Sequence, residues 1–345
     1  MKLQSIIAIA AIWISSAAIE SHASSNGNGK SMYPVGNLES SLAASAGQAS
    51  VVAVRCEDCV VIMSMSPQDR SCNLTLSHDD GGEIIRVDSD DHDNDGLIPI
   101  TSRGSVRIST PTPTSTRNTT TPNKRQINKA SRIMHVLQER YGLALFVTGF
   151  ASDAQMLTRY SAAHVAEHEH LYAGKAINAQ TLVRDALSPR LRGATMGGGR
   201  PFGVQALVVG NSNGSTSSMQ LITLDPSGNC RYWKGGATCI GKDSDIIKKH
   251  LHEILTSDKE SFANPQNWSQ ALDICMRALL ETVEESQNMK ETPSQEIISE
   301  LDAMIVFDSH LNSRPYSCGI ITRDAVMKSF RKCYSEMKES KGQKV

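Results

Sequence analysis

The chain lacks an excess of charge of either sign. Its 345 residues carry 35 Lys and Arg against 36 Asp and Glu, which leaves a formal net charge of −1. Phosphate-rich partners are attracted by clustered positive charge, so this balance argues against nucleic acid or an anionic membrane as an electrostatic partner. The length and composition are those expected of one main globular domain.

The sequence also lacks an apolar run long enough for a convincing membrane span. Its most apolar stretch, residues 6–19, is interrupted by serines and follows a lysine at position 2. Ser21 and Ala23 then place small residues where a signal peptidase cleaves. We therefore predict a secretory signal-like segment and no membrane span.

Regular patterning is missing from a long internal segment, at about residues 66–130. This segment is acidic around 88–95 and rich in Thr, Pro and Ser over 109–122. Such a composition buries too little apolar surface to offset the entropy lost on ordering, so most of it is predicted to be a disordered insertion. The predicted plan is a signal-like segment, a tail with a short helix, and a main domain that contains the insertion, at residues 1–23, 24–50 and 51–345.

Apolar runs bounded by turn residues predict the strands. Two runs flank a Cys-Glu-Asp-Cys turn, which is typical of a hairpin. Residues 143–149 and 204–209 are nearly unbroken apolar runs, as in strands covered on both faces. The predicted strands cover residues 51–55, 60–65, 143–149, 204–209 and 219–224, with 303–308 as an edge strand.

Helical periodicity predicts the remaining elements, at residues near 38–47, from 151 onward, and at 178–187, 246–255, 268–285 and 322–338. Ser152 is predicted to cap the helix that starts near Ala151, and Asp153 lies in its positive first turn. The residues of this helix that fall on one face at helical spacing are Met156, Leu157, Tyr160, Ala163 and His164.

Two patterns typical of metal sites each lack a necessary part. His164, Glu167 and His168 fit the H-x-x-E-H pattern of a zinc protease, but no third ligand can be assigned. Residues 91–98 reproduce the first eight positions of a calcium loop, but Ser102 stands where the bidentate glutamate belongs. We therefore expect no metal or cofactor, a solvated acidic loop, and exposed positions for His168 and His170.

The cysteines likewise lack the spacing of a zinc site. Cys56 and Cys59 form one C-x-x-C, and Cys230 and Cys239 are poorly spaced for the second half. Reduced structural cysteines are expected, with a hairpin disulfide as the alternative in a secreted chain. Four N-glycosylation sequons would matter only in that compartment, at Asn73, Asn118, Asn213 and Asn267.

Three ordered motifs stand in the middle of the chain. The first leads into the strand at 204–209, the second makes the turn after the returning strand, and the third comes before the helix at 246–255. Their order and spacing resemble the α-type subunits of the proteasome core particle, and the resemblance runs from about Ile133 to Lys242. The motif residues are Arg200, Pro201, Phe202 and Gly203, then Asp225, Pro226, Ser227 and Gly228, then Gly241 and Lys242.

The resemblance implies an α+β fold, a four-layer αββα sandwich of the N-terminal nucleophile hydrolase type, in which helix pairs cover two sheets. The pattern of elements alone indicates only α+β or α/β. Active β-type relatives use a threonine freed after a glycine, whereas Gln48 follows Gly47 here. An amide is neither nucleophilic nor titratable, and the family's carboxylate position falls near Ser64 or Met65. The resemblance thus implies a non-catalytic subunit without catalytic, cofactor or metal residues.

Family members form seven-membered rings that cap the proteolytic β rings and act in ubiquitin-dependent protein degradation. The resemblance implies other α-type and β-type subunits and regulatory activator particles as partners, and the cytoplasm and nucleus as location. The lysine of the family's activator pocket falls near His135 in this sequence. Because histidine is only partly charged at neutral pH, weaker or pH-dependent docking is expected.

Two alternatives stay open. The first is a secretory-pathway paralogue that keeps the fold and acts as an interaction protein. The second is a secreted metal-dependent hydrolase that uses His164, Glu167 and His168.

Overall fold

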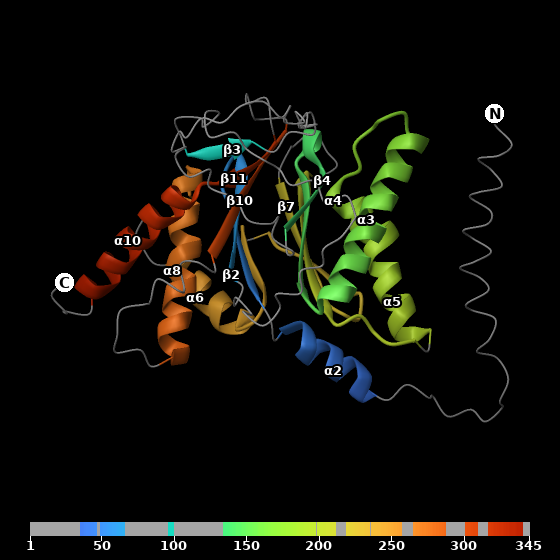
Figure 1. Ribbon diagram of the computed structural model, residues 1–345, viewed down its shortest axis with the longest axis horizontal. Coiled ribbons are helices and arrows are strands. Elements are labelled where there is room, and N and C mark those ends of the chain that lie inside the picture. Colours follow the sequence, from blue (N-terminus) through green and yellow to red (C-terminus); the bar gives the residue numbers. More distant parts are fainter. Residues whose placement is uncertain are drawn as a thin grey trace, which may run out of the picture.

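The protein is a four-layer sandwich in which two antiparallel sheets face each other and helices cover both outer faces (Figure 1). The computed structural model describes residues 35–46, 49–65, 96–99, 134–197, 199–211, 219–234, 236–256, 265–287, 301–309 and 317–340. The signal-like segment, Gln48, the calcium-like loop up to Asp95, Ser102 and three of the four sequons lie outside these residues. The layering confirms the predicted fold class.

Sheet A has six strands and contains the predicted N-terminal hairpin. In this hairpin Arg55 pairs with Val60, and the amide of Cys56 donates to the carbonyl of Cys59 at 2.7 Å. The strands lie in the order β3 (Leu97–Pro99), β11 (Cys318–Ile321), β10 (Leu301–Phe307), β2 (Cys59–Met65), β1 (Ser50–Arg55) and β9 (Ala237–Gly241).

The prediction of an edge strand at 303–308 was wrong. β10 lies between β2 and β11, and every residue of it except Asp302 is buried. The sheet continues past β10 because β11 pairs with β3, a three-residue strand within the stretch predicted as an insertion. Three residues are too few to show a periodic pattern.

Sheet B has five strands and contains the hairpin predicted around residues 204–224. β5 is buried along its whole length, as its apolar run predicts. The strands lie in the order β4 (Met134–Gln138), β5 (Leu143–Gly149), β6 (Val204–Asn211), β7 (Met219–Leu224) and β8 (Cys230–Tyr232).

Separate sets of helices cover the two sheets (Figure 1). Sheet A is covered by α6 (Ser244–Thr256), α8 (Trp268–Gln287) and α10 (Arg323–Ser340). Sheet B is covered by α3 (Ala151–Leu171), α4 (Ala179–Leu182), η3 (Val183–Leu187) and α5 (Ser188–Met196). The other helices among the described residues are α2 (Val35–Ala46) and the 3₁₀ turn η2 (Glu139–Tyr141). No helix within the described ranges combines the length and apolar character needed to cross a membrane.

The helix predicted at 178–187 is longer than expected, because α4, η3 and α5 form one continuous rod to Met196. Asn178 caps it by accepting from the Thr181 amide at 2.7 Å. The middle segment η3 is a π turn, in which the Ser188 amide donates to the Val183 carbonyl five residues back. This local change of bonding accommodates Pro189, which has no amide hydrogen to donate.

Of the residues that share the face predicted for α3, only Leu157 is buried. The buried face of this helix carries Ala154, Leu157, Ser161 and Val165 in addition to Asp153, whereas Met156 and Tyr160 are exposed. Ser152 does not cap the helix, because the N-cap position is Phe150 and has no side-chain cap. Periodicity alone could not choose between the two faces, since small and apolar residues occur on both.

A buried carboxylate joins α8 to α10 on the outer face of sheet A. Asp273 accepts from Ser329 Oγ at 2.5 Å and from Lys332 Nζ at 2.7 Å. The Asp273 side chain is 9% exposed and that of Lys332 is 59% exposed. The hydrogen bonds to Asp273 raise the pKa of Lys332 above its ordinary value. This contact fixes the packing of the last helix.

Replacing this carboxylate tests the contact. Asp273→Ala leaves the buried Ser329 hydroxyl without its acceptor and is expected to lower the free energy of unfolding by about 1–3 kcal/mol. Urea denaturation of the full chain measures the change. Asp245→Ala is the matched control, since Asp245 is 97% exposed in its pair with Lys248 and such pairs contribute about 0–1 kcal/mol. Equal losses in the two variants would contradict the account.

Candidate functional site

The Arg200–Gly203 motif ties the entry of β6 to the first turn of α3. The buried Asp153 carboxylate accepts from the Gly203 amide at 2.9 Å and from the guanidinium of Arg200. The Gly203 carbonyl in turn accepts from the Phe150 amide at 3.0 Å. Gly149 has φ of +119°, and a Cβ there would lie 2.1 Å from that carbonyl, so glycine is required. The motif is therefore a structural junction.

The middle of this motif anchors the junction in the core. Pro201 and Phe202 are buried, and Phe202 belongs to the apolar cluster between sheet B and its helices. The guanidinium carbon of Arg190, on α5, lies 5.9 Å from the centre of the Phe202 ring and 5.4 Å from that of Tyr160. Both distances suit cation–π attraction, which links α5 to α3.

The Asp225–Gly228 motif is a turn that docks onto α5. Asp225 Oδ1 accepts from the amides of Ser227 and Asn229, at 2.9 and 3.1 Å. Ser188 Oγ donates to the Gly228 carbonyl at 2.6 Å, and Gly228 has φ of +79°. A Cβ at Gly228 would lie 2.6 Å from the Ser188 carbonyl, so the close approach requires glycine. The carbonyl of Pro226 accepts a further hydrogen bond from α5.

The Gly241–Lys242 motif closes the end of the sandwich where β1 begins. The Ala49 carbonyl accepts from the Lys242 amide at 2.9 Å, and Ser50 Oγ donates to the Lys242 carbonyl at 2.8 Å. Gly241 has φ of +90°, and a Cβ there would lie 1.8 Å from the Ala49 oxygen. The Gly241 amide donates to Gln205 Oε1 at 2.9 Å, so this point also joins sheet A to sheet B.

Helix α2 covers this end of the sandwich. It packs against β5 and β6 of sheet B and β9 of sheet A, and Figure 1 shows it at the lower end of the sandwich, on the side of sheet B. Ser41 and Ser45 are its buried polar residues, and Ser45 Oγ donates to the Leu42 carbonyl at 2.8 Å. Ala49, at the start of β1, is buried. The start of β1 is therefore buried at the end of the sandwich to which α2 belongs.

Neither of the positions assigned to the family's carboxylate, Ser64 and Met65, carries a titratable side chain. Ser64 is buried and its Oγ has no hydrogen-bond partner among the described residues, and Met65 is half-buried. Sequence analysis missed Asp302, which pairs with Ser64 in the ladder because β10 lies beside β2. Partial burial raises the pKa of Asp302, and the charge of Arg323 opposes this shift. Asp302 could be assigned to this place only from the order of the strands in sheet A, and the sequence does not reveal that order.

His135 lies on β4, the edge strand of sheet B, opposite Leu145 of β5. It is half-buried. Met134 and Val136 on either side pack between the sheets, so alternation places His135 on the face that α3 covers. If the His135 side chain binds an activator, its charge lies at the edge of sheet B.

The residues of the H-x-x-E-H pattern do not form a metal site. The parts of the chain described in the structure contain no group of three His, Cys, Asp or Glu side chains placed to hold a metal ion. Glu167 and His170 are exposed, but the prediction that His168 is exposed was wrong. The His168 ring is half-buried because it packs on Tyr172, with ring centres 4.4 Å apart.

The seven cysteines within the described ranges are free thiols, and six of them are buried. Cys56 and Cys59 enter the same apolar cluster beneath α8. The hydrogen bond to Cys56, together with burial, raises the pKa of the Cys59 thiol well above its ordinary value. A protonated, buried thiol is a poor nucleophile and a poor metal ligand, so these cysteines act as core residues.

Comparison with known proteins identifies related chains. The family model described as "Proteasome subunit" matches residues 114–292. Proteasome subunit alpha 2 of Haloferax volcanii is 27% identical over 168 residues, which are 49% of this chain and 61% of the relative.

Two further relatives have similar coverage. Proteasome subunit alpha of Haloquadratum walsbyi is 31% identical over 125 residues, 36% of this chain and 47% of the relative. Proteasome subunit alpha-type 8 of Homo sapiens is 27% identical over 150 residues, 44% of this chain and 54% of the relative. The chain thus spans about half of the length of the curated relatives it matches.

A substitution at Gly241 tests the closed end. Gly241→Ala forces a Cβ against the Ala49 carbonyl, so faster amide hydrogen exchange is expected over residues 50–52, together with a lower thermal midpoint. Gly174→Ala is the matched control, because Gly174 has φ of +80° and nothing within 4 Å of its added Cβ. Unchanged exchange at the start of β1 in Gly241→Ala would refute the role assigned to this contact.

Proposed function

The chain belongs to the proteasome subunit family, and on this premise we propose that it is a divergent, non-catalytic α-type subunit of a proteasome core particle. The observation that carries the proposal is the closed end of the sandwich, where Ala49 and Ser50 at the start of β1 are buried and α2 packs against β5, β6 and β9. A threonine nucleophile at that place needs access for substrate and a group to take its proton. Ser64 and Met65 do not supply such a group.

In this particle the chain scaffolds an outer ring and contributes to substrate entry in protein degradation, including the ubiquitin-dependent route. Its partners are other α-type and β-type subunits and regulatory activator particles, in the cytoplasm and nucleus. Support comes from relatives that carry the name of proteasome alpha subunits and from the family match over residues 114–292.

The region that the family model matches, residues 114–292, supports the scaffolding role most directly. It contains all of sheet B and its helices, and it continues through β9, α6 and α8. It does not contain α2 or the residues before it, which form the pore-closing segment in α-type relatives. Lateral and stacking contacts are therefore the part of the proposal that the matched region supports, and the contribution to substrate entry rests on the residues before it.

Purification of a tagged full-length chain from its native cells under non-denaturing conditions tests the proposal. The expected result is elution in a large particle that also contains threonine-protease subunits, identified by mass spectrometry. Elution as a lone monomer at native expression levels would overturn it.

The secretory alternative makes a distinct prediction in the same preparation. A glycan on Asn267, which is exposed just before α8, would give a glycosidase-sensitive mass that Asn267→Gln removes. The proposal expects the unmodified mass in the particle-bound chain.

Activator docking at His135 is a further part of the proposal. In assembled particles, His135→Lys is expected to bind activator more tightly than wild type above about pH 7, because lysine keeps its charge there. His135→Ala is expected to bind more weakly below about pH 6, where the imidazole is charged. Binding measured across this pH range that is the same in all three proteins would remove His135 from the pocket.

A further inference from the structure

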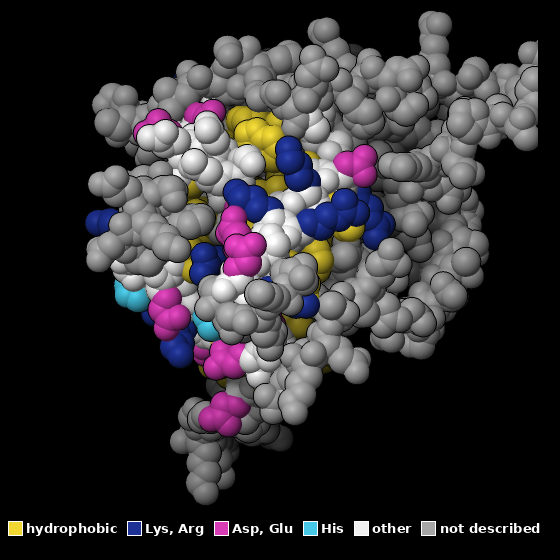
Figure 2. All heavy atoms as spheres, turned by 90° about the vertical axis from the view of Figure 1, so that its left-hand side faces the viewer, with side chains coloured by type: hydrophobic (Ala, Val, Ile, Leu, Met, Phe, Trp, Pro, Cys, Tyr) yellow, Lys and Arg dark blue, Asp and Glu magenta, His cyan; other side chains and the backbone are white. Residues whose placement is uncertain are grey.

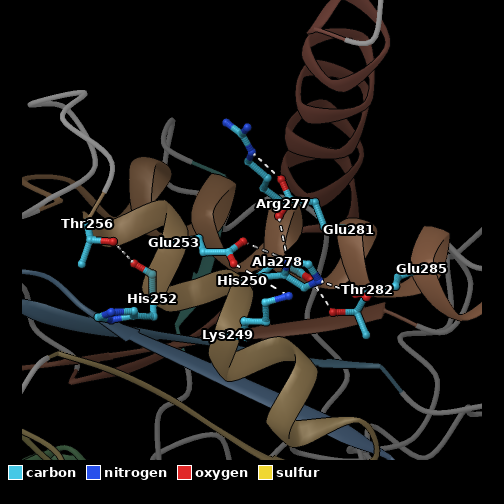
Figure 3. A network of polar contacts seen from close by, with 10 residues as sticks. All are labelled: Lys249, His250, His252, Glu253, Thr256, Arg277, Ala278, Glu281, Thr282 and Glu285. Atoms are coloured by element: carbon cyan, nitrogen blue, oxygen red, sulfur yellow. Dashed lines mark hydrogen bonds and ion pairs between the residues drawn. The ribbon is translucent and has the colours of Figure 1, made fainter.

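The helix layer on sheet A pairs its positive side chains with acidic ones. Its outer face mixes side chains of both signs (Figure 2). Lys249 Nζ of α6 lies 4.0 Å from Glu253, and Arg277 Nε of α8 lies 3.0 Å from Glu281 (Figure 3). The charges of these residues are therefore compensated within the helix layer itself.

The short strand β8 has a different setting, at the edge of sheet B. It pairs with β7 on one side, and the described residues supply no strand on its other side. All three of its residues, Cys230, Arg231 and Tyr232, are exposed. Such an edge is a template on which another chain can add a strand.

The backbone groups of two residues point out of this edge. The Trp233 amide donates to the Leu221 carbonyl at 3.0 Å, so Trp233 and, two residues earlier, Arg231 bond to β7. In an antiparallel ladder the alternate residues turn their amides and carbonyls to the opposite side, and here these residues are Cys230 and Tyr232. Within the described part of the chain, these outward groups have no backbone partner.

Two cations adjoin one indole ring beside the same edge. The guanidinium carbon of Arg231 lies 5.4 Å from the centre of the Trp233 ring, and Lys248 Nζ of α6 lies 5.9 Å from it. Trp233 Nε1 donates to Thr223 Oγ1 at 2.8 Å, and the ring packs against the cluster between the sheets. The fixed ring therefore holds a cation of sheet B close to one from the helix layer of sheet A.

The positive charge at this edge is only weakly compensated. Arg231 has no carboxylate partner among the described residues, so its guanidinium N–H groups can bind an added carboxylate. Lys248 pairs with Asp245 at 3.6 Å, but Asp245 is 97% exposed and such a surface pair is weak. Lys234, which is exposed directly after Trp233, adds a further positive charge. The charge here thus complements an acidic partner.

We propose that the outer edge of β8 binds an extended acidic segment of a partner protein, which pairs with Cys230 and Tyr232 as a further strand of sheet B. Alternate side chains of this segment face Arg231 and Lys248, and these are Asp or Glu. The side chains between them face the Tyr232 ring, which is 41% exposed, and are apolar. The inference concerns the isolated chain, so it does not depend on the proposed place in a particle.

Peptide binding to the full-length chain tests the charge requirement. The probe is a dye-labelled peptide of alternating Glu and Val, about six residues long, and binding is followed by fluorescence anisotropy. Wild type is expected to bind this peptide and not the corresponding peptide of alternating Lys and Val. Arg231→Ala should weaken binding about fivefold, because an exposed ion pair is lost. Asp245→Ala should tighten it, because the pair that competes for Lys248 is removed.

Arg190→Ala is the matched control. The Arg190 guanidinium carbon also lies 5.4 Å from an aromatic ring, that of Tyr160, but it belongs to α5 and not to the edge strand. This variant should bind the acidic peptide as wild type does.

Amide hydrogen exchange distinguishes the addition of a strand from attraction of charge alone. When the acidic peptide binds, the amides of Cys230 and Tyr232 should exchange more slowly, because they gain carbonyl partners. The Arg231 amide, which already bonds to β7, should change less. The proposal is overturned if the acidic and basic peptides bind alike, if Arg231→Ala binds as tightly as wild type, or if exchange at Cys230 and Tyr232 is unchanged.

Discussion

The contact between the Ala49 carbonyl and Gly241 is the constraint on which the arrangement of the sandwich depends. The two groups lie so close that only glycine fits, and the Lys242 amide and the Ser50 hydroxyl bond across the same point. Because Gln205 also bonds there, the contact fixes sheet A against sheet B at one end. With β1 held in this position, Ala49 and Ser50 are buried, and α2 packs against β5, β6 and β9 at the same end.

The three sequence motifs that indicated the family make close contacts of this kind between backbone segments. Asp153 with Gly203, Gly228 with Ser188, and Gly241 with Ala49 each bring two backbone segments closer than a side chain would allow or bond them through a buried carboxylate. Their order in the chain therefore identifies a fold and a family, and the family match over residues 114–292 extends that assignment through α8.

Much of the fold could be predicted because local signals were strong. β5 is a continuous apolar run, and the turn residues at 225–228 allow few other conformations. The predictions failed where contacts between distant parts of the chain determine the structure. The three residues of β3 pair with β11, and this pairing makes β10 a central strand. Likewise, the sequence of α3 is small or apolar on two faces, and Asp153 binding to the Arg200–Gly203 junction selects the one that is buried.

The site was less predictable than the fold. Asp302 lies opposite Ser64 only because β10 and β2 are neighbours in sheet A, and the sequence does not reveal this strand order. The closed end of the sandwich is the central claim, and electron cryomicroscopy of the particle that contains this chain tests it most directly. We predict density for α2 at the end of the sandwich where β1 begins, in a subunit of an outer ring. Density for this chain in a proteolytic ring, with the start of β1 open to the chamber, would contradict the account.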